Sequence, residues 1–212
     1  MFGILMDGGW MMLPLVICSV VAVAIIIDRA RAFRAAGSAH EALRKQVAAE
    51  LRAGRAEAAA EACAAAQGPV AATVLAGLRR YATLKARGKA PEEIEPVVAK
   101  TMEEYAPKAM HGLQKRLNGL VLIASISPLL GMTGTVTGMI RSFDVMAASA
   151  GLDPGAVAGG IAEALITTAA GLLIAMPAVI AHSAFSKRIE DYTVTIESCV
   201  ADIVDFISGE QG

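Results

Sequence analysis

A single carboxylate interrupts an otherwise apolar stretch in the C-terminal part of the chain. The segment "GIAEALITTAAGLLIAMPAVI", Gly160 to Ile180, contains Glu163 and no other charged residue. Glu163 follows Asp153 by ten residues, which is about 15 Å along a helix. A charge inside a membrane costs at least roughly 2.5–3.5 kcal/mol, so such acids usually face a bundle interior or an aqueous path. We expect Glu163 to titrate near mid-membrane, the alternative being an interfacial Glu on a helix that starts later.

Hydroxyl side chains are expected near the same depth. Thr135 and Thr168 each lie nineteen residues from the basic pair that flanks their apolar segment. If those pairs mark similar depths, both hydroxyls lie at one level, near that of Glu163. On an ideal helix Thr168 is about 140° around from Glu163, whereas Thr167 is only about 40° away. Either Thr168 and Glu163 line different surfaces or the helix is distorted, and Thr167 stays open as the alternative.

The apolar segment that precedes this one has a small, weakly polar face. Its members recur at helical spacing and are Ser127, Gly131, Thr135, Gly138 and Ser142, with Gly134 and Gly138 forming a GxxxG. Small residues let helices in a membrane approach closely. The same face would also suit a narrow wet cavity, where hydroxyls and a nearby carboxylate could hold water and protons. Both explanations stay open.

These residues require helices long enough to hold them in a membrane. Uncharged runs cover Trp10 to Ile27, Leu117 to Ile140 and about Ala156 to Phe185, and a core of about 30 Å needs roughly 20 helical residues. In the first run the positive charges follow the apolar core, which indicates a retained helix with its N-terminus outside rather than a signal peptide. The join "AASAGLDPGA" has no positive charge, as an outside loop should.

Most of the basic residues lie between the first two spans. Sixteen of the nineteen Lys and Arg residues fall between Arg29 and Arg116, where nine Glu and no Asp leave a net charge of about +7. Such a bias marks a cytoplasmic segment more than a nucleic-acid site. Its Ala-, Glu- and Arg-rich sequence predicts three or four helices, the last continuing into the second span with a bend or interruption at Pro107. Beyond Lys187, apolar residues at 3-4 spacing predict an amphipathic helix that packs on this domain.

The predicted fold is therefore an all-α integral membrane protein with three transmembrane helices and a helical cytoplasmic domain between spans one and two. The predicted segments are an outside N-terminus at 1–9, transmembrane helices at 10–27, 117–146 and 156–186, a cytoplasmic helical domain at 28–116, a periplasmic loop at 147–155 and a cytoplasmic tail helix at 187–212.

Other chemistry finds little support in the sequence. The cysteines are few and far apart, which suits apolar packing better than a disulfide or metal role: Cys18, Cys63 and Cys199. The histidines lack metal-ligand spacing: His40, His111 and His182. The spans hold no paired catalytic acids and no Ser/His motif. We expect neither an enzyme nor a metal or organic cofactor.

Two motifs at a characteristic spacing point to a family. "SPLLGMTGTVTGMIRSF" followed by "GGIAEALITTAAGLLIAMPAVIAHSAF" resembles the paired signature of the MotA/TolQ/ExbB proton-channel family, most closely its TolQ/ExbB branch. The resemblance covers the last two spans densely and the remainder only in layout. By motif position, Thr135 is similar to the family's pore threonine, Glu163 to its acid and Thr168 to its second threonine. The chain departs from the pattern at Arg141, where another polar residue is common, which leaves the role of that position open.

The resemblance implies a mechanism and partners. It implies a bacterial inner-membrane pentamer around two copies of a single-span protein of the ExbD/TolR/MotB kind, whose Asp carries protons. Proton passage would move that partner and drive work at the cell envelope, through a TonB/TolA-like protein in some systems. Membrane lipid is then the other contact, and nucleic acid is not a partner. Glu163 would tune or relay protons, the coupling ion, because five ionised acids around one axis would repel.

Alternative functions remain to be separated from this one. A structural membrane scaffold would use the small-residue face for assembly only, and a partner-independent small ion-coupled transporter would act without a single-span protein. Within the family the sequence leaves iron-complex uptake, outer-membrane maintenance and surface motility open. Arg141 and Asp144 are three residues apart, so we expect a local surface pair, with a role in gating as the alternative.

Overall fold

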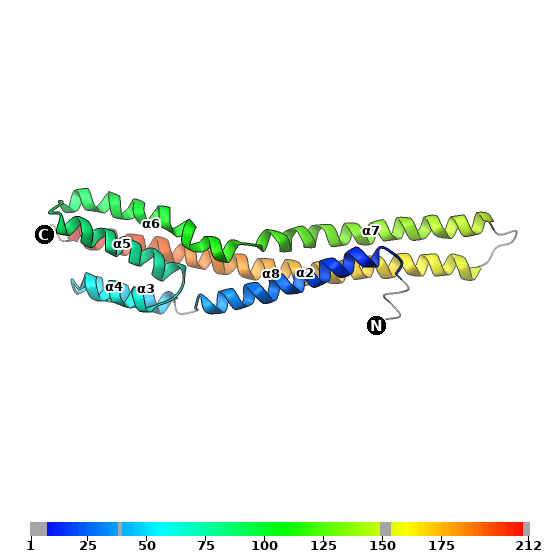
Figure 1. Ribbon diagram of the computed structural model, residues 1–212, viewed down its shortest axis with the longest axis horizontal. Helices are drawn as coiled ribbons and strands as arrows, with labels where there is room; N and C mark the ends of the chain where they lie inside the picture. Colours follow the sequence, from blue (N-terminus) through cyan, green and yellow to red (C-terminus); the bar gives the residue numbers. More distant parts are fainter. Residues whose placement is uncertain (1–7, 38–39, 149–153, 210–212) are drawn as a thin grey trace. The chain divides into compact units, whose positions relative to one another are not determined.

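A computed structural model describes residues 8–37, 40–148 and 154–209. Every regular element in these ranges is a helix (Figure 1): α2 Met12–Ala35, α3 His40–Arg52, α4 Ala56–Ala65, α5 Pro69–Ala86, α6 Pro91–Gln114, α7 Leu117–Ala148 and α8 Pro154–Gly209. The predicted all-α class is confirmed. Most of the expected N-terminal segment 1–9 and of the loop 147–155, and the last three residues of the tail, lie outside the described residues.

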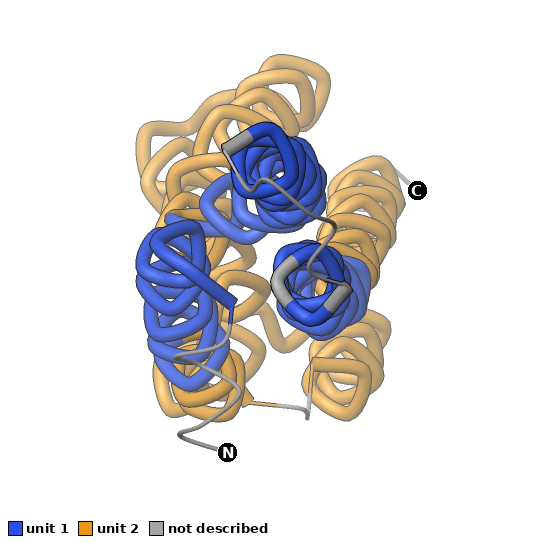
Figure 2. The backbone as a smooth tube through the Cα atoms, turned by 90° about the vertical axis from the view of Figure 1, so that its right-hand side faces the viewer, with its two compact units in different colours: residues 1–28, 116–185 blue, residues 29–115, 186–212 orange. Residues whose placement is uncertain are grey.

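The chain folds as two compact units, which Figure 2 distinguishes by colour. Unit 1 comprises residues 1–28 and 116–185, and unit 2 comprises residues 29–115 and 186–212. Helices α2 and α8 each contribute residues to both units. The candidate site residues all belong to unit 1.

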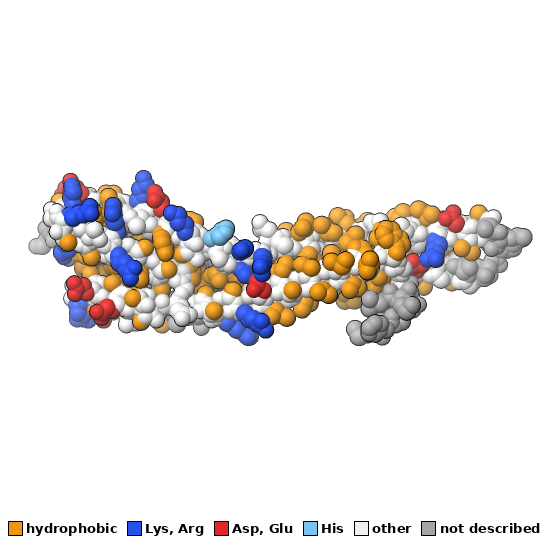
Figure 3. Space-filling view, viewed as in Figure 1, with side chains coloured by type: hydrophobic (Ala, Val, Ile, Leu, Met, Phe, Trp, Pro, Cys, Tyr) orange, Lys and Arg blue, Asp and Glu red, His pale blue; other side chains and the backbone are white. Residues whose placement is uncertain are grey.

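Unit 1 is built from apolar helices. The described residues include three helices long and apolar enough to cross a membrane, α2, α7 and α8, which confirms the predicted number of spans. Apolar side chains dominate the visible surface of α7 and the first part of α8 (Figure 3), and Leu129, Phe143 and Leu173 are among the most exposed. Because lipid offers no partner for free backbone groups, such segments must satisfy their hydrogen bonds internally as helices. Pro128 and Pro177 lie inside α7 and α8 without ending either helix.

The predicted continuation of the last cytoplasmic helix into the second span is wrong. Helix α6 runs through Pro107 and ends at Gln114, and α7 begins at Leu117 after Arg116 adopts a left-handed φ of 69°. A left-handed residue terminates a helix, usually as glycine. Pro107 is tolerated because it and Glu103, whose carbonyl it leaves without a helical donor, are both exposed to water.

Ionic contacts fix the residues on either side of that break. In unit 2 the buried Arg29 guanidinium donates to the carbonyl oxygens of Gly112 and Leu113, at 2.7 and 3.3 Å, and so pairs with the C-terminal end of α6. A cation at this end also complements the helix dipole. In unit 1, Arg116 forms an ion pair with Asp28 at 3.1 Å.

Unit 2 has a conventional apolar core. Val74 on α5 and Val98 and Met102 on α6 are almost fully buried. The end of α8 lies against these helices with its apolar face, where the Tyr81 and Phe206 rings meet edge to face with centroids 5.6 Å apart. The buried residues of that face are Tyr192, Ile196, Cys199, Ile203 and Ile207. This is the packing that the 3-4 spacing beyond Lys187 predicts.

Candidate functional site

The small-residue face of α7 is a close contact with α8. All of its members except the half-buried Thr135 are buried: Ser127, Gly131, Gly134, Gly138 and Ser142. A Cβ atom placed on Gly138 would lie 2.8 Å from the Gly160 carbonyl oxygen, and one on Gly131 would lie 3.0 Å from the Thr168 Cα. Both approaches are too tight for any side chain. Of the two explanations that the sequence left open, the structure shows helix packing within one chain for this face.

Polar groups along this contact bond across it. The Thr168 hydroxyl donates to the Gly131 carbonyl oxygen at 3.0 Å, and the Ser142 hydroxyl lies 3.1 Å from the Gly138 carbonyl and 3.3 Å from that of Val157. The Ser127 hydroxyl is fully buried and has no hydrogen-bond partner among the described residues. Thr168, which the family motif suggests as pore-lining, therefore faces α7 and uses its proton there.

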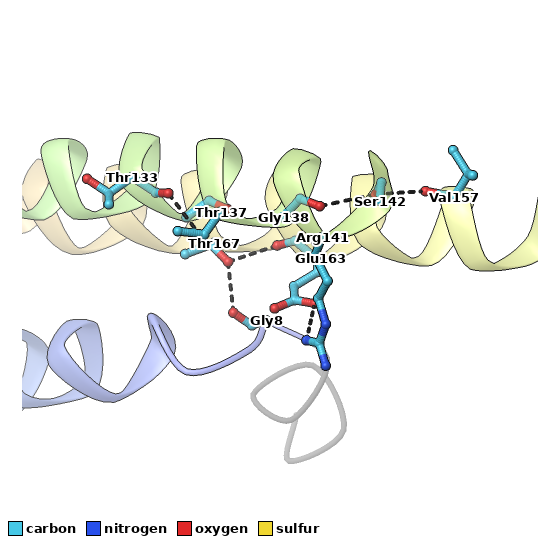
Figure 4. Close-up of polar contacts among 10 residues, drawn as sticks. Gly8, Thr133, Thr137, Gly138, Arg141, Ser142, Val157, Glu163 and Thr167 are labelled. Carbon is cyan, nitrogen blue, oxygen red and sulfur yellow. Dashed lines mark hydrogen bonds and ion pairs between the residues drawn. The ribbon is translucent and has the colours of Figure 1, made fainter. Parts of the chain in front are cut away.

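Glu163 contacts a different set of residues (Figure 4). Its carboxylate Oε2 lies 3.3 Å from Nη1 of Arg141 on α7, in an ion pair whose Glu163 side chain is 20% exposed and whose Arg141 side chain is 71% exposed. The expected Arg141–Asp144 pair is therefore not the contact that Arg141 makes. One signal could have revealed the observed pair: Arg141 and Glu163 are equally distant in sequence from position 152, near the turn between two antiparallel spans.

The segment before the first span covers the other side of Glu163. Gly9 has a left-handed φ of 66°, and a Cβ atom there would collide with Glu163 Oε1. The Thr167 hydroxyl lies 2.9 Å from the Gly8 carbonyl oxygen and 2.8 Å from the Glu163 carbonyl oxygen. A hydroxyl carries one proton, so it donates to one of these oxygens at a time or shares the proton between them.

We call Arg141, Glu163, Thr167 and the backbone of Gly8 and Gly9 the carboxylate cluster. This cluster explains why Thr168 and Glu163 are far apart around the helix. Glu163 and Thr167 contribute to the cluster, whereas Thr168 faces α7. The two threonines thus line different surfaces, and the helix needs no distortion to explain their separation.

Thr135 belongs to neither surface. It is half-buried, and its hydroxyl donates to the Met132 carbonyl oxygen at 2.6 Å within α7. Gly134, not Thr135, approaches α8, where a Cβ on Gly134 would overlap the Thr167 side chain. Thr135 is one helical turn beyond Gly131, the partner of Thr168, so the two hydroxyls lie within about 6 Å in depth.

Helix length gives a second measure of the depth of Glu163. It precedes Lys187 by 24 residues of the continuous helix α8, which is about 36 Å. A hydrocarbon core is about 30 Å thick. If the core begins at Lys187, this length exceeds its thickness by about 6 Å, so Glu163 lies at or beyond the opposite boundary. That agrees with the interfacial alternative better than with the midpoint that counting from Asp153 predicts.

The carboxylate cluster has the chemistry of a proton site more than of a metal site. A carboxylate and a hydroxyl can accept and donate protons, and a guanidinium alongside offsets the carboxylate charge. Among the described residues no group of three or more His, Cys, Asp or Glu side chains could hold a metal ion.

Comparison with known proteins places these residues in context. The model of a family described as the MotA/TolQ/ExbB proton channel family matches residues 65–198. The Tol-Pal system protein TolQ of Pseudomonas aeruginosa is 39% identical over 116 residues, covering 54% of this chain and 50% of the relative. The biopolymer transport protein ExbB of Pseudomonas putida is 30% identical over 142 residues, covering 67% of this chain and 43% of the relative.

A third relative matches over a shorter stretch. The biopolymer transport protein ExbB of Salmonella typhimurium is 41% identical over 90 residues, which cover 42% of this chain and 37% of that protein. The chain thus spans half or less of the length of the curated relatives it matches. The family model includes all of α7 and the part of α8 that carries Glu163.

Proposed function

Because this chain belongs to the MotA/TolQ/ExbB proton channel family, we propose that it is the proton-channel subunit of a bacterial inner-membrane motor. In this proposal the proton motive force, acting through this subunit and an ExbD/TolR-like single-span partner, drives work at the cell envelope. The relatives' names mention a Tol-Pal system and biopolymer transport. We propose work of the Tol-Pal type, transport of the TonB type or motility of the gliding type for this chain. Protons are the coupling ion, and no other cofactor is required.

The observation that carries the proposal is Glu163, the only formally charged residue between Pro154 and Ser186 on α8. An acid on a membrane-spanning helix usually faces a bundle interior or an aqueous path and serves transport or proton transfer, and Glu163 stands at the outer end of such a helix. Here the Arg141 guanidinium contacts the carboxylate, and the backbone of Gly9 lies against it. The Thr167 hydroxyl bonds to the backbone carbonyl of the same residue. Passage of one proton across 100 mV supplies about 2.3 kcal/mol, so a few protons provide enough energy to move a partner.

The charge distribution supports one orientation. Basic residues collect between Arg29 and Arg116 and again at Lys187–Arg188, and such residues favour the cytoplasmic side. We therefore assign a periplasmic N-terminus and a cytoplasmic C-terminus. With Lys187 at the cytoplasmic boundary, the carboxylate cluster lies toward the periplasmic end of the path, where protons enter.

Exposed apolar surface supports an assembly. Helices α7 and α8 leave large apolar side chains uncovered, including Met132, Val136 and Leu165, and a single chain cannot enclose a path between them. We propose a homopentamer around a single-span partner, with lipid on its outer surface. In this proposal the half-buried Thr135 lines the path between copies, and its hydroxyl can turn from the Met132 carbonyl to water or to the partner.

One observation favours the scaffold alternative for the small-residue face of α7. The face from Ser127 to Ser142 is closed by α8, so its small residues serve packing rather than conduction. The scaffold and the channel therefore differ only at the carboxylate cluster and at Thr135, and the test must act there.

The test combines composition with proton flux. We would isolate the chain from its own membrane with its bound proteins, determine the stoichiometry by native mass spectrometry, and measure proton flux after reconstitution into liposomes. Glu163→Gln should reduce flux at least about tenfold, in line with removing a group that handles protons. Asp144→Asn, a matched change at an exposed acid on α7, should leave flux unchanged.

Each rival predicts a different result. A five-to-two complex with a single-span protein whose flux needs Glu163 supports the motor subunit. A scaffold gives a stable oligomer in which Glu163→Gln and Thr135→Val change nothing. A small ion-coupled transporter gives flux from a monomer or dimer that retains no single-span protein.

A further inference from the structure

Arg141 is isolated among the charges of its segment. It is the only Lys or Arg between Arg116 and Lys187, and its guanidinium reaches 3.3 Å from Glu163 Oε2 on the neighbouring helix. The family resemblance gives this position no role. In Figure 4, Arg141 and Glu163 extend toward each other from α7 and α8, beside the Gly8 backbone.

Both carboxylate oxygens of Glu163 have neighbours. Arg141 contacts Oε2, and the Gly9 backbone lies so close to Oε1 that a Cβ at that position would collide with it. The Thr167 hydroxyl bonds to Gly8 and to the carbonyl of Glu163, which ties the covering segment to the same turn of α8. The carboxylate is thus held in one place with a compensating positive charge.

We propose that Arg141 is an ion-selectivity residue, which keeps sodium and other metal cations from binding at Glu163 so that protons alone are exchanged there. This inference rests on the proposed channel function and adds to it the discrimination between protons and metal cations. It is carried by the Arg141–Glu163 pair and the Gly9 backbone that close the carboxylate.

The physical reason is a difference in how the two ions bind. A hard metal cation must replace its lost water with several oxygen ligands, and it favours sites with uncompensated negative charge. The Arg141–Glu163 pair has no net charge: the guanidinium contacts Oε2, and the Gly9 backbone lies against Oε1. A proton needs no coordination shell, because it passes between water, hydroxyl and carboxylate oxygens along hydrogen bonds. Without Arg141, the carboxylate would be a net negative site open on one side.

The test compares two substitutions at one position. The complex purified through this chain from its own membrane is reconstituted into liposomes, and sodium and proton fluxes are measured in parallel. Arg141→Gln removes the charge and should raise the ratio of sodium to proton flux at least about tenfold, as charge in a focused cleft changes local ion concentration by 10–10³. Arg141→Lys keeps the charge and should restore a ratio close to that of the wild type.

Native mass spectrometry on each variant shows whether the complex is intact, which separates selectivity from assembly. An intact Arg141→Gln complex with the wild-type ratio would overturn the inference while leaving the proposed function in place. A wild-type complex that already passes sodium as readily as protons would also overturn the inference, and it would leave the proposed function in place. An intact wild-type complex that passes neither ion would contradict the proposed function, and the inference would fail with it.

Discussion

The two units of this chain differ in what their surfaces expose. Unit 2 buries large apolar side chains such as Val98 and Met102 and exposes Glu, Lys and Arg. Unit 1 buries Leu120 but also Gly134 and Thr167, and it leaves many other large apolar side chains exposed. Water makes the first arrangement favourable, because apolar burial is the main driving force there. Lipid gives helices no such incentive to associate, so close backbone approach and interhelical hydrogen bonds hold them together.

The comparison shows that glycine can weaken a helix in water and yet permit close helix packing in a membrane. In an ordinary soluble helix, glycine costs up to about 1 kcal/mol relative to alanine. Along the contact of α7 with α8 it allows the close approach, since Cβ atoms added at Gly138 and Gly131 would meet backbone at 2.8 and 3.0 Å. Substitutions there should therefore have the largest effect on the fold.

Gly160→Leu should prevent the α7–α8 contact, so that little or no folded complex is recovered. A side chain at this position would overlap Ser142 and press on the Gly138 carbonyl, which belongs to backbone that cannot move away. Gly159→Leu is the matched control, because a Cβ there has nothing within 4 Å. The measurement is the yield and size of the complex in mild detergent. Equal yields for the two variants would contradict the close contact.

Met102→Ala should destabilise unit 2 by about 2–5 kcal/mol, because it opens a cavity in a water-excluded core. Met102 is fully buried, against Gly77 of α5. Leu173→Ala, at a side chain that is 65% exposed in unit 1, should cost less than about 1 kcal/mol, because lipid is as apolar as the leucine it replaces. Thermal unfolding in lipid nanodiscs would measure both. A cost at Leu173 equal to that at Met102 would show that this face is a protein interface.

Cys63 should react slowly with alkylating reagents in the folded protein. Burial in α4 raises the pKa of its thiol to about 11, from a usual 9.0. Because the thiolate is the reactive form, alkylation near pH 8 should be about 100-fold slower than in the unfolded chain. The rate should rise with pH until the thiol ionises near pH 11. A rate near that of the unfolded chain, measured by mass spectrometry, would show that the core of unit 2 opens readily.

The sequence predicted the parts of this fold that local physics determines. Uncharged runs bounded by basic pairs gave three spans, and apolar residues at 3-4 spacing gave the face of α8 that packs in unit 2. The end of α6 was missed because Arg116 adopts a left-handed conformation that no sequence signal marks, while Pro107, the expected break, stands exposed in a continuing helix.

The candidate site was predicted only in part, because its contacts depend on helix register. Spacing along α7 included both Thr135 and Gly134, and the structure shows the close contact with Thr167 of α8 at Gly134. The contact between Arg141 and Glu163 spans 22 residues and two helices, so periodicity within one helix could not reveal it. Equal distance from the turn, a rule for antiparallel pairs, was the signal that would have done so.

We expect the smallest change in stability from substituting a surface charge of unit 2. Such a substitution can be compared with one in the carboxylate cluster. Lys89, which precedes α6, forms an exposed ion pair with Glu93 in the first turn of that helix, at 3.0 Å. In water exposed pairs contribute about 0.2–1 kcal/mol, because solvent screens the charges and the long side chains lose freedom when they meet. Lys89→Ala should therefore lower the unfolding free energy by no more than about 1 kcal/mol, and by less at high salt. Arg141→Gln, which unpairs a largely buried carboxylate, should lower the thermal stability of the complex more, in nanodiscs at the same salt. If the two substitutions cost the same, Glu163 is as well solvated as a surface acid, and the carboxylate cluster lies in water rather than within the helices.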